Sequence, residues 1–396
     1  LLLKSTFLLF YRYLCAKSVL SFLVRIRSTI YKSIFRAKFG FAADKVSQLT
    51  NGLTIQSDLS ASALQVQYNI IQAGFTFISL LILGLVLEFK TLLIAIAIGL
   101  IIYSLMLITL RVAKNIGYNL AQLNEKYYKD INHGLKNYKY LKSTYSSYAI
   151  FNRISPLLSK INSEQIKFTV VNMGTKLFTD PIVVLSIATV LFISLTYLSV
   201  SLASVVVIYI ILGRIYVQLI SIIGQLQAYH KETESYKYCN KLISESKKYE
   251  EENGEEIFES LSEDIYLKDI SYLIGNRTLL NKFSIHVPRN QTTLIYGPSG
   301  SGKTTLLNLI IGLIKPTSGT VRINSIDISD FNHKSLRSKI GVVSQDIVYF
   351  NLNIRDNLSL RNRNISDDQI YDFIDKFNLK NIFPKGEIDL NYIIDE

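Results

Sequence analysis

Apolar residues are concentrated before residue 225, in stretches long enough to cross a membrane. Residues 61–87 and 91–110 are two such stretches, and only the charged turn at residues 88–90 separates them. Residues 181–198 and 202–223 form a second pair. Each stretch has roughly 20 residues, which is enough to cross ~30 Å of hydrocarbon as a helix. The short turns therefore predict two helical hairpins in a membrane.

The polar segments beside these stretches keep a helical pattern. Residues 1–18 are typical of the end of another span, and their pattern continues through Arg25 and Arg27. Residues 111–148 and 152–176 contain few Gly or Pro residues and show no strand-like alternation. The alternative for them is a separate soluble loop domain. The absence of alternation favours helices that continue beyond the bilayer.

The pattern changes in the last third of the chain. Residues 247–264 are acidic and polar, as a linker would be, and from residue 265 short β-branched segments alternate with turns and helices. We therefore predict a multi-domain membrane protein, with an all-α transmembrane domain that has long intracellular helix extensions and a smaller α/β domain. The predicted boundaries are 1–246 for the transmembrane domain, 247–264 for the linker and 265–396 for the α/β domain.

The chain has a formal net charge of +12. Residues 111–176 carry eleven Lys and Arg against three Asp and Glu, between apolar spans. This places them on the cytoplasmic side by the positive-inside rule, and it explains the basic excess without a nucleic-acid partner. Cys15 and Cys239 provide neither a disulfide framework nor metal-ligand spacing.

A phosphate-binding loop is the clearest chemical motif. Residues 297–304 have the G-x-x-x-x-G-K-[ST] spacing, after a strand-like segment at 292–296 and before a helix-like one at 304–313. A flexible Gly/Ser loop would not need every fixed position filled in this context. The backbone N–H groups would cradle phosphates, Lys303 would reach the β- and γ-phosphates, and Thr304 would ligate Mg²⁺. The residues predicted to bind nucleotide here are Gly297, Pro298, Ser299, Gly300, Ser301, Gly302, Lys303, Thr304 and Thr305.

Together, the spans, the helical extensions and the loop resemble a half-transporter of the ATP-binding cassette (ABC) exporter family, over essentially the whole chain. Residues 306–324 resemble the helix, turn and hairpin that follow the family's phosphate loop, and residues 340–346 resemble its Q-loop strand. The resemblance implies that Gln345 contacts Mg²⁺ and the attacking water, so that Lys303 and Gln345 are catalytic, while Thr304 and Gln345 are Mg²⁺ ligands. The implied cofactors are ATP and Mg²⁺.

The membrane half resembles the family as well. Residues 41–58 are similar to its first intracellular loop, and Asp180-Pro181 to the start of its fifth helix. By family order, the visible spans are helices two to six and the first is missing. The register of Lys4 before Arg27, and of Arg214 before Gln225, resembles bacterial lipid A flippases.

The chain also departs from the family pattern. The family places an aromatic residue under adenine, and the position falls on Tyr272 or, by a second alignment, on Ile274. Tyr272 has an alternative as a strand residue of the core. No signature loop or switch histidine follows, and residues 392–396 imitate a Walker B strand too close to the Q-loop. We interpret the α/β domain as C-terminally truncated.

Three basic residues fall within apolar segments: Lys4, Arg12 and Arg214. An ionisable residue inside a membrane is costly, so each is a candidate substrate contact. The alternative is that these side chains reach out to lipid headgroups. As a substrate site, three cations predict an amphiphile with an anionic group.

The sequence predicts an ATP-driven exporter or flippase half that pairs with a second half-transporter, as a homo- or heterodimer. It would be a multi-pass protein of the bacterial inner membrane, with the cassette in the cytoplasm and membrane lipids as partners. The cargo would be a lipid, peptide or other amphiphile. The alternatives are a regulatory or channel-like ATP-binding protein and the degenerate half of a heterodimer, neither of which hydrolyses ATP productively. We expect ATPase activity of the full-length protein and none of these 396 residues alone.

Overall fold

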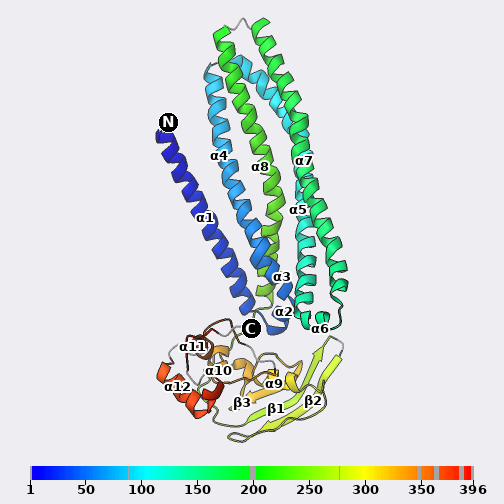
Figure 1. The fold of residues 1–396 in the computed structure, drawn as a ribbon, viewed down its shortest axis with the longest axis vertical. Helices are drawn as coiled ribbons and strands as arrows, with labels where there is room; N and C mark the ends of the chain where they lie inside the picture. The colour runs from blue at the N-terminus through cyan, green and yellow to red at the C-terminus, as the bar shows by residue number, and fades with distance from the viewer. Residues whose placement is uncertain are drawn as a thin grey trace. The chain divides into compact units, whose positions relative to one another are not determined.

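A computed structural model gives the fold of the chain (Figure 1). It describes residues 2–87, 89–196, 202–275, 277–345, 349–360, 365–382 and 388–393. The chain divides into two compact units, Leu1–Glu251 and Glu252–Glu396.

The described residues of the first unit are predominantly helical. Figure 1 shows α4, α5, α7 and α8 running side by side, with α1 along α4. The elements are α1 (Leu2–Phe35), α2 (Phe39–Asp44), α3 (Val46–Asn51), a π-helical turn (Gly52–Gln56), α4 (Ser57–Leu87), α5 (Phe89–Lys136), α6 (Tyr138–Ser143), α7 (Ser147–Thr196) and α8 (Leu202–Lys248).

The helices of this unit are long enough to cross a bilayer and continue beyond it. Among the described residues, three stretches are apolar enough to span a membrane: Ser5–Phe35, Val46–Leu87 and Tyr209–Lys248. Predicted span 91–110 lies in α5, and residues 181–196 of the other predicted span, 181–198, lie in α7. Most side chains of the first span and several of the second lie outside the described part, as do residues 197–198. Because α5 and α7 are 48 and 50 residues long, the predicted helical extensions are confirmed.

Helix packing in this unit combines apolar contacts with close backbone approach. Ile30, Cys239 and Leu242 belong to a buried cluster where α1 meets α8. The π-helical turn lies against the same part of α8, since a Cβ on Gly52 would be 2.8 Å from Leu242 Cδ2. At Gly117 the backbones of α5 and α8 touch, because a Cβ there would lie 2.3 Å from the carbonyl oxygen of Lys231.

The second unit combines an antiparallel sheet with short helices. The sheet has the order β2-β1-β3-β4, and both neighbours of β1 are antiparallel to it. Its strands are β1 (Ile265–Ile274), β2 (Arg277–Val287), β3 (Ser318–Ile323) and β4 (Ile326–Asp327). Its helices are α9 (Lys303–Ile310), α10 (His333–Arg337), α11 (Ile354–Ser359) and α12 (Asp367–Lys376), with 3₁₀ turns at Ile328–Asp330 and Leu379–Ile382. The predicted fold class, helical membrane domain followed by an α/β domain, is confirmed.

The core of the second unit lies between the sheet and α9. Leu306 and Leu309 of α9 are buried with Ile270 of β1 and Val321 of β3. Phe258 is buried in the same core, so part of the segment before β1 packs onto this unit.

Asp264 joins the two strand ends at the open end of the β1–β2 hairpin. Its carboxylate accepts 2.6 Å hydrogen bonds from the Arg289 backbone N–H and His286 Nε2, and these lower the pKa of Asp264.

Two predicted strands do not form. Residues 292–296 and 340–344 have no strand geometry. Ile295 and Ile340 pack against the core, but other apolar side chains are exposed: Leu294 is 80% exposed, Tyr296 87% and Val343 99%. A β-strand requires a neighbouring segment that pairs with its N–H and C=O groups. No described segment pairs with either stretch, so their β-branched composition alone does not produce a strand.

The contact at Gly117 predicts opposite effects of the same substitution at two glycines. Gly117→Ala should separate α5 from α8 and cost ~1–3 kcal/mol, because the clash is with backbone. Gly174→Ala on α7 is the matched control. No atom outside its own helix turn lies within 4 Å, and Ala is favoured over Gly in helices by up to ~1 kcal/mol. Thermal unfolding in one detergent should give a lower midpoint for Gly117→Ala only, and equal midpoints would contradict the packing.

Candidate functional site: the phosphate loop before α9

The phosphate loop wraps the start of α9. Gly300 and Gly302 have φ angles of +79° and +92°, in the left-handed region that favours glycine. Gly302 is the residue before the first turn of α9, which begins at Lys303. The loop therefore turns its backbone toward the positive end of the helix, where unpaired N–H groups and the helix dipole favour an anion.

The hairpin β1–β2 supports this loop from one side. A Cβ on Gly302 would lie 3.1 Å from Leu280 Cδ2 and 3.4 Å from the Leu279 carbonyl oxygen. Gly302 therefore serves two purposes, its backbone conformation and its close approach to β2. Sequence reasoning missed this support, because nothing in residues 279–280 marks them as neighbours of the loop.

The Lys303 side chain folds back into the loop. Its Nζ donates hydrogen bonds to the carbonyl oxygens of Gly297 and Pro298, at 2.9 Å and 2.7 Å. The ammonium is thus held by neutral carbonyls beside a helix N-terminus. A phosphate oxygen there would form stronger charge-assisted hydrogen bonds with it. The loop consequently fits a polyphosphate.

The helix behind the loop is firmly anchored. Leu306 and Leu309 are buried in the core of the unit, while Thr304 in the first turn is exposed. The far end of α9 is held by Arg337, whose Nη2 donates to the Gly312 carbonyl. An anchored helix holds its N-terminus in place, so the anion site does not have to be assembled when a ligand arrives.

The other sequence-predicted residues of this unit lie in different surroundings. Tyr272 pairs with Leu280 across β1–β2 and packs against the core. Its strand partner is therefore the same leucine that supports the loop. Ile274, the alternative position, is exposed. Gln345 is exposed, and no hydrogen bond between described residues joins it to the loop. Thr304 and Gln345 thus remain predicted Mg²⁺ ligands, and residues 394–396 lie outside the described part.

The predicted substrate cations lie in the first unit. Arg12 is exposed on α1 and Arg214 on α8, and no described acidic residue forms an ion pair with either. The side chain of Lys4 lies outside the described part. Asp180 of α7 accepts a hydrogen bond from Tyr216, two residues beyond Arg214, and is therefore engaged elsewhere.

Two family models match the chain. The model described as "ABC transporter transmembrane region" matches residues 1–228, and the model "ABC transporter" matches residues 280–391. The chain belongs to the ABC transporter family. The second match contains the phosphate loop, α9 and Gln345, and the first covers more than half of the sequence. The resemblance to ABC exporters is therefore confirmed, and the family implies ATP binding.

Individual relatives match the chain over shorter segments. ABC transporter B family member 29, chloroplastic, from Arabidopsis thaliana is 39% identical over 105 residues, 26% of this chain and 17% of the relative. The mitochondrial iron-sulfur clusters transporter ATM1 of Candida glabrata is 38% identical over 111 residues, which are 28% of this chain and 15% of the relative. An ATP-dependent lipid A-core flippase of Desulfotalea psychrophila is 36% identical over 108 residues, which are 27% of this chain and 19% of the relative. The match thus spans less than one fifth of each relative.

The contact between the loop and β2 predicts a difference between two glycines that both have a positive φ. Gly302→Ala should lower the affinity for a fluorescent ATP analogue at least tenfold, since the new methyl group meets both Leu280 and the Leu279 carbonyl. Gly275→Ala is the control, because Gly275 also has a positive φ, +57°, but has no atom within 4 Å. Titration of both variants with the analogue measures the difference. Equal affinities would exclude β2 as the support of the loop.

Proposed function

We propose that the protein is one half of an ATP-driven exporter or flippase, which works as a dimer with a second half-transporter. The observation that supports this most strongly is the combination, in one chain, of an anchored phosphate loop and a bundle of helices that are long enough to leave the membrane. A simple membrane anchor would need one span, whereas this chain has several.

Lys303 and the loop N–H groups would hold the β- and γ-phosphates of ATP. Thr304 and Gln345 would ligate Mg²⁺, which neutralises charge on the phosphates when bound. In phosphoryl transfer the protein contributes mainly positioning and charge stabilisation, and a rigid α9 is suited to this. Tyr272 would lie beside the adenine. The family resemblance implies that Gln345 senses the γ-phosphate.

Closure of the cassettes would be transmitted to the membrane by projecting helices such as α5 and α7. The short helix α6 joins them, and its surroundings present exposed aromatic side chains: Tyr138, Tyr140, Tyr145, Tyr148 and Phe151. Exposed aromatic clusters of this kind favour a protein contact. Arg153 on α7 binds Asp130 on α5 at 3.0 Å, and Asn119 contacts Glu164 at 3.4 Å. These links would make the helix pair move as one body.

The basic excess of residues 111–176 supports a cytoplasmic location for this end of the helices, with the cassette on the same side. The membrane would be a bacterial inner membrane. The domain limits would be 1–246, 247–264 and 265–396. The cargo would be an amphiphile with an anionic head, because Lys4, Arg12 and Arg214 lie in apolar stretches and a phosphate or carboxylate would replace their lost hydration.

Substitution of Lys303 tests the proposed ATPase in the full-length protein. Lys303→Ala should abolish Mg²⁺-dependent hydrolysis, and Lys303→Arg should fail too, because a planar guanidinium does not replace a compact ammonium inside the loop. Lys315→Ala is the matched control, since Lys315 is exposed and pairs with Glu252 at 2.8 Å. Normal phosphate release by Lys303→Ala would refute the role of the loop. A parent protein that binds ATP without turnover would favour the regulatory alternative.

Substitution of the membrane cations tests the cargo. The double variant Lys4→Gln, Arg214→Gln should lose the stimulation of ATPase by anionic lipid while its basal ATPase stays near that of the parent, because the cassette is unchanged. Stimulation by a neutral or cationic compound should change little. The measurement is ATPase in vesicles with and without phosphatidylglycerol. An unaltered response to this lipid would reduce the two residues to interfacial anchors.

A further inference from the structure

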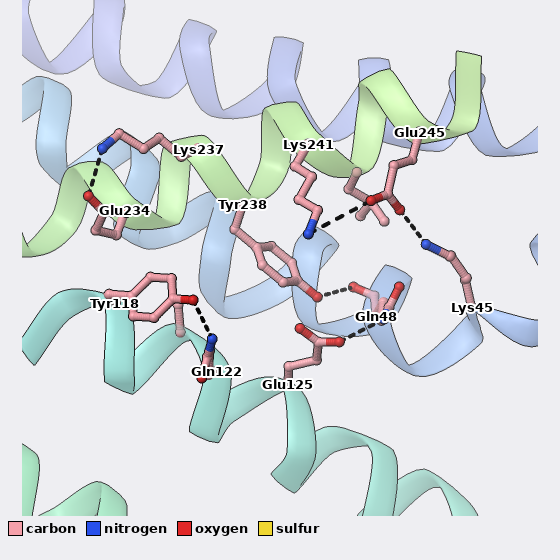
Figure 2. A pocket seen from close by; sticks show the side chains of 12 residues that line it. Lys45, Gln48, Tyr118, Gln122, Glu125, Glu234, Lys237, Tyr238, Lys241 and Glu245 are labelled. Carbon is pink, nitrogen blue, oxygen red and sulfur yellow. Dashed lines mark hydrogen bonds and ion pairs between the residues drawn. The ribbon is translucent and has the colours of Figure 1, made fainter. Parts of the chain in front are cut away.

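A cavity of about 340 Å³ lies among α3, α5 and α8 of the first unit. Figure 2 shows side chains from all three helices pointing into it. Tyr118 and Glu125 come from α5, Gln48 from α3, and Tyr238 and Lys241 from α8. A volume of this size is at the lower end of small-molecule sites.

Most charges in the cavity wall are already paired. Lys237 Nζ forms an ion pair with Glu234 Oε1 at 2.7 Å. Glu245 forms ion pairs with both Lys45 and Lys241, and the Nζ of Lys241 lies 3.9 Å from Glu245 Oε1. The Glu245 end of the cavity therefore carries one positive charge in excess. Lys241 supplies it, because its side chain is 76% exposed and only loosely held.

Glu125 is the negative counterpart. Its carboxylate accepts a 2.6 Å hydrogen bond from the Gln48 side-chain amide, and no Lys or Arg of the described residues lies within ion-pair distance of it. Figure 2 shows the carboxylate facing Gln48 and the hydroxyl end of Tyr238. The rings of Tyr118 and Tyr238 line the same cavity. A carboxylate beside aromatic rings is a favourable site for an ammonium group.

The cavity lies far from the apolar part of its helices. Residues 234–245 of α8 are 11 to 22 residues beyond the apolar stretch that ends at residue 223. At 1.5 Å per residue this is about 16 to 33 Å along the helix. The site is therefore outside the hydrocarbon, where a water-soluble molecule has access and a lipid chain does not.

We propose that this cavity binds a small, water-soluble zwitterion of the short-peptide class. The ammonium group lies against Glu125 between the two tyrosines, and the acidic group lies against Lys241. The molecule is thereby matched to a cavity whose wall is neutral as a whole but has one free charge of each sign. This proposal does not rest on the proposed transport function, because the nucleotide site takes no part in it.

The experiment uses one introduced tryptophan. The chain contains no Trp, so Tyr118→Trp creates a unique fluorophore in the cavity wall while keeping an aromatic ring. The probes are the dipeptide Ala-Leu, its N-acetyl derivative without the ammonium, and its C-terminal amide without the carboxylate. In the 396-residue chain, Ala-Leu should bind at least tenfold more tightly than either capped form. Equal binding of the three would overturn the proposal without any further variant.

Charge-neutral substitutions then assign each end. In the Tyr118→Trp background, Glu125→Gln should remove the preference for the free ammonium, and Lys241→Gln the preference for the free carboxylate. Glu234→Gln is the matched control and should keep both preferences, because Glu234 is already paired with Lys237. Retention of the ammonium preference in Glu125→Gln would refute the assignment. An unchanged thermal-unfolding midpoint of the helical unit in detergent verifies that each variant is folded.

A further probe tests the source of the zwitterion. Glycerophosphocholine carries one positive and one negative charge like the dipeptide, but it has the chemistry of a lipid headgroup. Its binding should be at least tenfold weaker than that of Ala-Leu, since its quaternary ammonium cannot donate hydrogen bonds to Glu125. Tighter binding of glycerophosphocholine would overturn the short-peptide class in favour of a lipid headgroup.

Discussion

The need to satisfy backbone hydrogen bonds inside hydrocarbon is the constraint on which this structure depends. An N–H or C=O group without a partner in a bilayer costs several kcal/mol, so a segment that crosses it must be a helix. Here the helices do not stop at the interface. The 47 to 50 residues of α5, α7 and α8 correspond to about 70 Å each, more than twice the hydrocarbon thickness. Continuous helices join the apolar spans to the charged cavity without a flexible connection.

The phosphate loop follows a different principle, in which a tertiary contact completes a local motif. Glycine at 302 allows the left-handed turn, but the position of the turn depends on β2, against which it is packed. The buried leucines of α9 hold the helix so that its N-terminus stays fixed. Binding energy of a nucleotide is therefore not spent on ordering the loop, which is the advantage of a preorganised site.

Charge is handled differently in the two units. At the loop, a single ammonium is kept among neutral carbonyls, ready for an anion. In the cavity of the helical unit, the charges of three lysines and three glutamates cancel, and Glu125 and Lys241 are the two that lack a close ion-pair partner. Exposed ion pairs of this type contribute little to stability, typically ~0–1 kcal/mol. Their arrangement is better explained by recognition than by folding.

The sequence by itself determined the long apolar helices, their extensions and the family that residues 297–304 indicate, because each depends on local composition or on spacing along the chain. It did not determine the strands expected at 292–296 and 340–344, since a strand exists only where another segment pairs with it. It could not place Leu280 beneath Gly302, nor bring Lys241 of α8 to the face of α5 that carries Tyr118 and Glu125, because these segments are far apart in sequence. Only the packing of whole helices and strands decided those neighbours, and with them the charges that each site leaves free.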